Sequence, residues 1–266
     1  MSLILKITDT TFTDNTLPVL QRDGTVDAGT KFLFDFADPY CWPKQAAPLN
    51  GDQFANFVNG GAAAVTSLVG GSTMTFATGG IGFDTETNEG IILPASGNLP
   101  ANNQGFLFCI WLKHLAQADQ TSINAVGGYS NQLGVNNQYA LVALNASGTY
   151  RLYAQGSNVP IPFPANGTIV QLAVAIVKVG TNMVLRAYMN GAQYGADVAL
   201  GAASTFSLNQ VAAAQMPSPE LGYLAGSSQG WCGSIYRTYL TDTGATGADP
   251  IAILQADYAA NSGRFT

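Results

Sequence analysis

The chain alternates between apolar and polar positions in many short runs, a pattern typical of β-strands whose two faces meet different surroundings. The runs that predict strands are residues 31–36, 73–76, 80–83, 90–93, 104–113, 138–144, 149–155, 168–179, 183–189, 221–223 and 231–240. Turns rich in glycine, asparagine and proline separate them, and the glycine pair Gly127-Gly128 is interpreted as one such turn. About a dozen short strands at this spacing predict an all-β, antiparallel β-sandwich.

The longest run, residues 168–179, carries large aliphatic side chains on one face and small or polar side chains on the other. The two sets are Val170, Leu172, Val174 and Ile176, and Gln171, Ala173 and Ala175. We therefore expect this strand to face the core on one side and a closely packed layer on the other. Asn190-Gly191 predicts a tight hairpin after the next strand, because both residue types tolerate positive φ.

One short helix is predicted near the C-terminus. Asp249 can cap its first turn and Pro250 fits the first helical position. Ile251, Leu254 and Tyr258 then fall on one face at helical spacing.

The first residues differ from the rest, so the chain is divided into an arm, 1–28, and a sandwich, 29–266. Leu3, Leu5 and Ile7 alternate with other residues as a weak strand signal. An arm with a short strand could pair with a sheet edge of a neighbouring protein. The same residues could equally be the first strand of the sandwich itself.

Composition narrows the possible partners. Only 10% of the residues are charged, against roughly a quarter in an average soluble protein. Such a surface suits contact with other protein copies, since few charges must be desolvated; a sturdy secreted β-protein without partners is the alternative. The net charge is −6 and the ten Lys and Arg residues are scattered, which argues against nucleic-acid binding.

The cysteines and the N-terminal residues indicate the cellular compartment in which the chain is expected to fold. Cys41, Cys109 and Cys232 lie far apart, which fits neither a disulfide framework nor a metal motif and suits folding in a reducing cytoplasm. Cys109, inside an apolar run, is expected to be a small core residue. The first residues do not resemble a signal peptide, and no run approaches the ~20 apolar residues of a membrane helix.

Several stretches occur in a recognisable order. They are residues 34–43, 57–61, 80–84, 108–113, 188–191, 221–223, 233–235 and 253–265. In that order they resemble the laminin-G-like, concanavalin A-like jelly-roll domains of tailed-phage virion structural proteins. The resemblance implies a concanavalin A-like jelly roll with an N-terminal arm and a short C-terminal helix. It also implies a non-enzymatic virion protein: a capsid decoration, neck or tail accessory, made in the host cytoplasm.

The partners that follow from this resemblance are other virion proteins and further copies of the chain, with a trimer favoured. A host-surface glycan is a possible additional ligand, and membrane insertion is not expected. The alternative is a secreted β-sandwich protein that binds or cleaves carbohydrate.

Few residues suit catalysis, and none is assigned a catalytic role. His114 is the single histidine and no G-x-S-x-G motif accompanies it. Asp84, Glu86 and Glu89 form the densest acidic cluster, but they lack the tighter E-x-D-x-E strand of the related glucanases. No cofactor is expected. Oxygen ligands at Asp84, Glu86 and Asn88 make a weak calcium candidate.

Exposed aromatic rings beside amides are what a glycan site requires, since sugar faces stack on them. Tyr40, Trp42, Tyr129 and Trp231 are the candidates, and Asn131, Asn136 and Asn137 supply nearby amides. Each ring could instead belong to the core, which is the commoner place for an aromatic residue in a β-sandwich.

Overall fold

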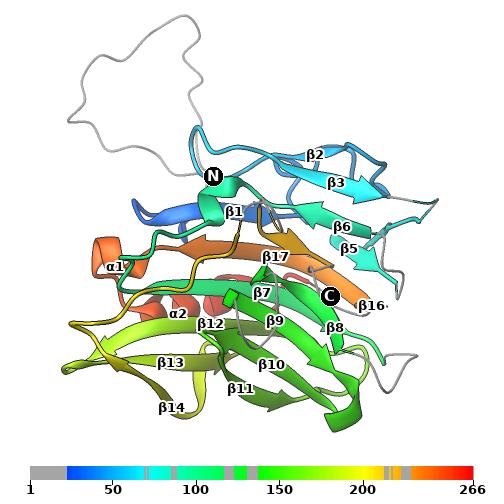
Figure 1. Ribbon diagram of the computed structural model, residues 1–266. Coiled ribbons are helices and arrows are strands. Elements are labelled where there is room, and N and C mark those ends of the chain that lie inside the picture. Colours follow the sequence, from blue (N-terminus) through cyan, green and yellow to red (C-terminus); the bar gives the residue numbers. More distant parts are fainter. Residues whose placement is uncertain are drawn as a thin grey trace, which may run out of the picture.

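The computed structural model describes residues 23–68, 70, 72–84, 89–116, 123–130, 137–212, 216, 218–222 and 229–265. These residues form two stacked, predominantly antiparallel sheets with a helix near the C-terminus, which confirms the predicted all-β sandwich (Figure 1). In the described ranges no helix is both long and apolar enough to cross a bilayer.

Sheet A contains the last strand of the chain, β17 (Gly233–Thr241), next to its central strand, β7 (Phe106–His114). Its strands in spatial order are β14 (Ala192–Ala202), β13 (Asn182–Met189), β12 (Ile169–Val179), β7, β17, β5 (Gly80–Phe83) and β4 (Thr75–Ala77). β1 (Thr30–Asp35) pairs with β17 as well. The Asn190-Gly191 turn between β13 and β14 has φ values of 53° and 74°, as the hairpin prediction required.

Sheet B lies against sheet A. Its strands in spatial order are β11 (Ser157–Pro162), β10 (Thr149–Ala154), β9 (Asn137–Leu144), β8 (Ile123–Ser130), β15 (Glu220–Leu221), β6 (Glu89–Ile92), β3 (Ala64–Leu68) and β2 (Gln53–Phe54). β16 (Gln229–Gly230) pairs in parallel with β8. Short 3-10 turns, η1 (Ala95–Gly97) and η2 (Asn145–Ser147), and a one-turn helix, α1 (Thr243–Thr246), complete the connections.

The turn predicted at Gly127-Gly128 is wrong, because both residues lie inside β8. Gly128 pairs with Ala140 of β9, and a Cβ there would collide with the backbone of that strand. Glycine marks a close backbone approach at this position, with a bulge between Ala125 and Gly127.

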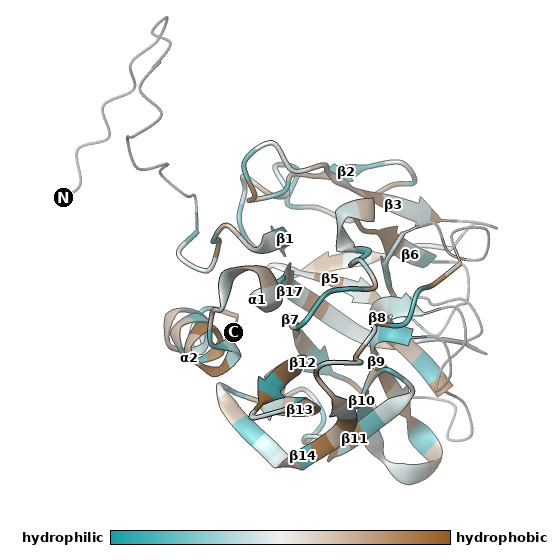
Figure 2. Ribbon diagram, turned by 60° about the vertical axis from the view of Figure 1, so that its left-hand side comes forward, coloured by the Kyte–Doolittle hydropathy of each residue, from teal (hydrophilic) through white to brown (hydrophobic). Residues whose placement is uncertain are grey.

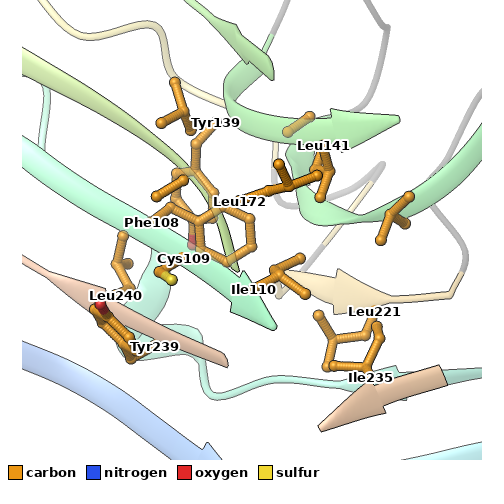
Figure 3. Close-up of a cluster of buried hydrophobic side chains, with 14 of the residues drawn as sticks. Phe108, Cys109, Ile110, Tyr139, Leu141, Leu172, Leu221, Ile235, Tyr239 and Leu240 are labelled. Carbon is orange, nitrogen blue, oxygen red and sulfur yellow. The ribbon is translucent and has the colours of Figure 1, made fainter. Parts of the chain in front are cut away.

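The core fills the space between the sheets. Phe108 and Ile110 of β7 point toward Tyr139 and Leu141 of β9, and the Phe108 and Tyr139 rings are 4.6 Å apart (Figure 3). Cys109, on the opposite face of β7, is fully buried, which confirms its expected role as a core residue.

The helix α2 (Pro250–Asn261) covers the outer face of sheet A, on the side away from sheet B (Figure 2). The Asp249 side chain caps the N-terminus of this helix, as predicted. The Tyr258 ring stacks on Trp111 at 5.6 Å, and Gln171 Nε2 donates to Leu254 O at 3.2 Å. This helix is the closely packed layer that the small and polar face of residues 168–179 predicts.

A buried charge cluster joins β17, α2 and both ends of the described chain. The Arg237 guanidinium donates to Asp257 at 2.9 Å, to Asp23 at 2.8 Å and to Asp35 at 3.1 Å. Arg264 also pairs with Asp35. Asp23, which belongs to the predicted arm of residues 1–28, is therefore bonded to the sandwich, and the division into an arm and a sandwich stays a prediction. Residues 1–22 lie outside the described ranges.

The pKa values of Asp23 and Asp35 shift in opposite directions within this cluster. Burial opposes ionisation of Asp23, but hydrogen bonds and charge from Arg237 outweigh it and hold the pKa of Asp23 below its usual value. Burial raises the pKa of Asp35, which is more deeply enclosed, in spite of its two arginine partners.

Candidate functional site

Three of the four predicted stacking rings are inside the protein. Trp42 is 1% exposed, and Tyr129 and Trp231 have no exposed area. Trp42 packs on Phe54 with ring centroids 4.8 Å apart, and the Tyr129 hydroxyl donates to Met216 O at 3.2 Å. The prediction that these rings form a glycan platform is wrong, because a sugar needs an accessible ring face.

Tyr40 is the exception among the predicted rings. It is 38% exposed, and its ring meets Phe57 edge to face at 5.2 Å. The amides expected near the platform are not gathered around it in the described chain: Asn137 is buried in β9, and Asn131 and Asn136 lie outside the described residues. Among the four predicted rings, Tyr40 is therefore the exposed one.

The weak calcium candidate is only partly described. Asp84 is exposed and its backbone N–H donates to the Glu89 carboxylate, whereas Glu86 and Asn88 lie outside the described residues. Within those residues, no group of three or more His, Cys, Asp and Glu side chains could hold a metal ion. Calcium binding here stays a prediction.

His114 lies at the end of β7, as expected, but it is buried. Its Nδ1 is 2.8 Å from the Tyr150 hydroxyl, and its ring packs on Phe163 at 4.7 Å. Burial lowers the pKa of the imidazole, so the neutral form dominates at pH 7. The side chain is accounted for by these core contacts.

A pocket of about 360 Å³ lies where the edges of the two sheets approach one another, between β14, the β10–β11 hairpin and the chain after β14. We call it the β11–β14 pocket. Its side-chain functional groups come from Gln155, Ser157, Thr205, Phe206, Ser207 and Asn209, and residues 199–202 of β14 complete the lining. Its volume lies within the range of small-molecule sites.

The Gln155 side chain fixes one wall of this pocket. Its Nε2 donates to Ser207 O at 2.5 Å, and its Oε1 accepts from Asn209 N at 2.6 Å. Gln155 and Gly156 form the two-residue turn between β10 and β11, with φ values of 55° and 77°. Glutamine is an unusual choice for positive φ, so the two hydrogen bonds of its amide give a reason for its presence.

The chemistry of the lining suits a sugar. Phe206 is a half-buried lining residue that also packs against the core, Ser157, Thr205 and Ser207 carry hydroxyl groups, and Asn209 carries an amide. Sugar recognition combines an apolar ring contact with a few placed hydrogen-bonding groups. Sequence reasoning missed these residues because they come from separate segments that only the sandwich brings together.

Glu220 is an acidic residue whose pKa is raised by burial. It lies half-buried in β15, beside the inward-facing Leu221, and burial raises its pKa to about 7. Within the described chain its carboxyl makes no hydrogen bond or ion pair. A carboxyl with a pKa near neutrality is suited to donate a proton at physiological pH.

No family model and no curated protein matches the chain. Solved structures do. A Trypanosoma rangeli sialidase in complex with sialic acid matches with a TM-score of 0.58 and 10% identity over 94% of this chain and 36% of the sialidase chain. The same sialidase in another structure gives 0.55 and 10% over 91% and 34%. A GH54 α-L-arabinofuranosidase gives 0.46 and 11% over 77% and 50%.

At this identity the likeness to the sialidases shows the fold, a β-sandwich. This chain spans about a third of the length of the sialidase chains that it matches. The comparisons correct two expectations from the sequence, namely the role in a phage virion and the absence of enzymatic activity. The similar structures are carbohydrate-active enzymes, and this finding contradicts the interpretation of the chain as a non-enzymatic phage virion protein. The virion assignment has no support from them.

Proposed function

We propose that this chain is a carbohydrate-binding β-sandwich and that the β11–β14 pocket is its glycan site. The observation that carries the proposal is the lining itself: a half-buried Phe206 ring among hydroxyl and amide groups, with one wall fixed by Gln155. The sandwich likeness to the sialidases supports it at the level of fold.

The pocket is tested with the full chain on a glycan array, followed by calorimetry on the best glycan. Phe206→Ala removes the ring, and we expect affinity to fall about tenfold or more, equivalent to roughly 1.4 kcal/mol. Tyr40→Ala is the matched control, since Tyr40 is an exposed ring that does not line the pocket. If the Tyr40→Ala variant loses binding and the Phe206→Ala variant keeps it, the pocket is the wrong site.

A second variant tests the wall of the pocket. Gln155→Asn keeps a residue that tolerates positive φ but shortens the side chain by one methylene, so it can no longer bridge Ser207 O and Asn209 N. We expect weaker glycan binding with an unchanged circular dichroism spectrum. Unchanged affinity would show that this wall does not shape the site.

Carbohydrate cleavage is the second candidate function, and Glu220 is the observation that favours it. A carboxyl with a pKa of about 7 can protonate the leaving oxygen of a glycosidic bond. The check is hydrolysis of a panel of aryl glycosides and oligosaccharides. Activity that disappears in Glu220→Gln supports this role, and activity that persists in that variant rules Glu220 out as the acid.

A further inference from the structure

Every side chain that lines the β11–β14 pocket is uncharged. The ion pair nearest in sequence to its β14 wall is Arg186 with Asp197. Arg186 Nε and Nη2 donate to the two carboxylate oxygens at 2.7 and 2.9 Å, so the two charges already satisfy one another. Asp197 also accepts from Gln193, and neither charged residue lines the pocket.

Building on the proposed glycan function, we infer that this pocket takes neutral sugar residues and discriminates against acidic ones. The ligand class is thus a glycan end formed by a hexose or pentose, without a sialic acid or uronic acid group in the pocket.

The physical reason is the cost of an unpaired carboxylate. A sugar carboxylate that leaves water needs an arginine, a lysine or several aligned donors to replace its hydration. The lining offers hydroxyl and amide groups, and Gln155, its best placed amide, is already used at both ends to hold the wall. The net charge of −6 adds a repulsion that salt partly screens.

None of the remaining arginines and lysines of the described residues lines the pocket. Arg237 and Arg264 are held in the buried cluster around Asp35. Lys31 pairs with Asp242, and Lys44 pairs with Asp52. These cations are therefore committed to contacts within the sandwich, away from the pocket lining.

The inference is tested on a glycan array that carries galactose-, glucose-, mannose- and arabinose-terminated oligosaccharides together with sialylated and uronic-acid-terminated counterparts. We expect binding to neutral termini and at least tenfold weaker binding to their acidic counterparts. The difference should shrink, without reversing, when salt is raised, since the repulsive part is screened.

A charge introduced into the lining makes the test sharper. Ser207→Lys places an ammonium at an exposed lining position, and the wall is kept because Gln155 bonds to the backbone oxygen of residue 207. We expect this variant to gain acidic-glycan binding about tenfold or more over the wild type. Ser204→Lys is the matched control: it is exposed, adds the same charge and lies outside the lining, so it should leave the preference unchanged.

The outcomes separate the two proposals. Pocket-dependent binding of acidic termini equal to or tighter than binding of neutral ones overturns the ligand class and leaves the glycan function standing. A gain in Ser204→Lys equal to that in Ser207→Lys also overturns it, because the effect would then be general charge. Binding of no glycan of either class overturns the proposed function itself.

Discussion

Arg237 and Asp257 form an ion pair with no exposed side-chain area: the guanidinium Nε donates to the carboxylate Oδ1 at 2.9 Å. The pair joins β17 to α2. Asp257 also accepts from Trp111 Nε1 at 2.7 Å and from Gln171 Nε2 at 2.8 Å. One carboxylate thus fixes the helix to three strands of sheet A, and the other carboxylates around Arg237 bring in the two ends of the described chain.

Removal of the arginine should be strongly destabilising. Arg237→Ala leaves Asp257 and its buried neighbours without their cation, and a broken buried pair costs about 3–5 kcal/mol. Urea denaturation followed by circular dichroism measures the loss. The control is Lys44→Ala, which breaks the exposed pair with Asp52 and should cost about 1 kcal/mol or less. Similar losses in both variants would contradict the role assigned to Arg237.

Two truncations test where the sandwich begins. Deletion of residues 2–28 removes Asp23 and Thr25, whose oxygens accept hydrogen bonds from the Arg237 guanidinium. We expect it to lower the melting temperature clearly, because a buried guanidinium loses partners; the loss is on the order of 3 kcal/mol. Deletion of residues 2–22 retains both residues and is the comparison. Equal melting temperatures for the two truncations would show that Asp23 contributes nothing.

Two glycine substitutions separate backbone strain from steric collision. Gly180 and Gly222 have φ values of 60° and 82°, so alanine is strained at either position by about 1–2 kcal/mol. At Gly180 a Cβ meets nothing within 4 Å, whereas at Gly222 it would collide with the Phe83 ring. We expect Gly222→Ala to cost about 1–3 kcal/mol more than Gly180→Ala in chemical denaturation.

The free energy of unfolding should depend on pH through Glu220. Its pKa is raised from 4.5 in the unfolded chain to about 7 in the folded protein, so the folded state binds the proton more tightly. Its contribution is fully present below pH 4.5 and is lost as pH rises through 7. The total effect is at most about 3 kcal/mol, by the conversion from pKa to free energy.

Glu220→Gln removes this titration. Denaturation curves at several pH values between 4 and 8 should show the wild type losing stability relative to Glu220→Gln as pH rises. Parallel curves for the two proteins across this range would show that the carboxyl is not shifted. The same variant serves the hydrolysis assay, so its stability must be measured first.

The apolar and polar pattern predicted a strand correctly where each face of that strand meets one kind of surroundings along its whole length. Residues 168–179 alternate because one face meets the core and the other meets α2, and the structure shows both surroundings. β14 was not predicted, because most of its residues are exposed or half-exposed and its apolar positions do not alternate clearly. β8 was missed because Gly127 and Gly128 read locally as a turn, although they serve close strand packing.

The site shows the same division. Rings chosen from the sequence as platforms, such as Trp42 and Trp231, are buried, because ring type does not determine exposure. Gln155 carried no signal, since its role depends on hydrogen bonds to Ser207 and Asn209, more than fifty residues away.

The amino-acid sequence by itself determined the all-β class, the main strands, the hairpin at Asn190-Gly191 and the capped C-terminal helix, because period, turn residues and caps act over a few neighbours. Only the tertiary structure decided which side chains are accessible, which carboxylates surround Arg237, and that Gln155 and Phe206 line one pocket. Those features depend on contacts between distant segments, and local spacing carries no information about such contacts.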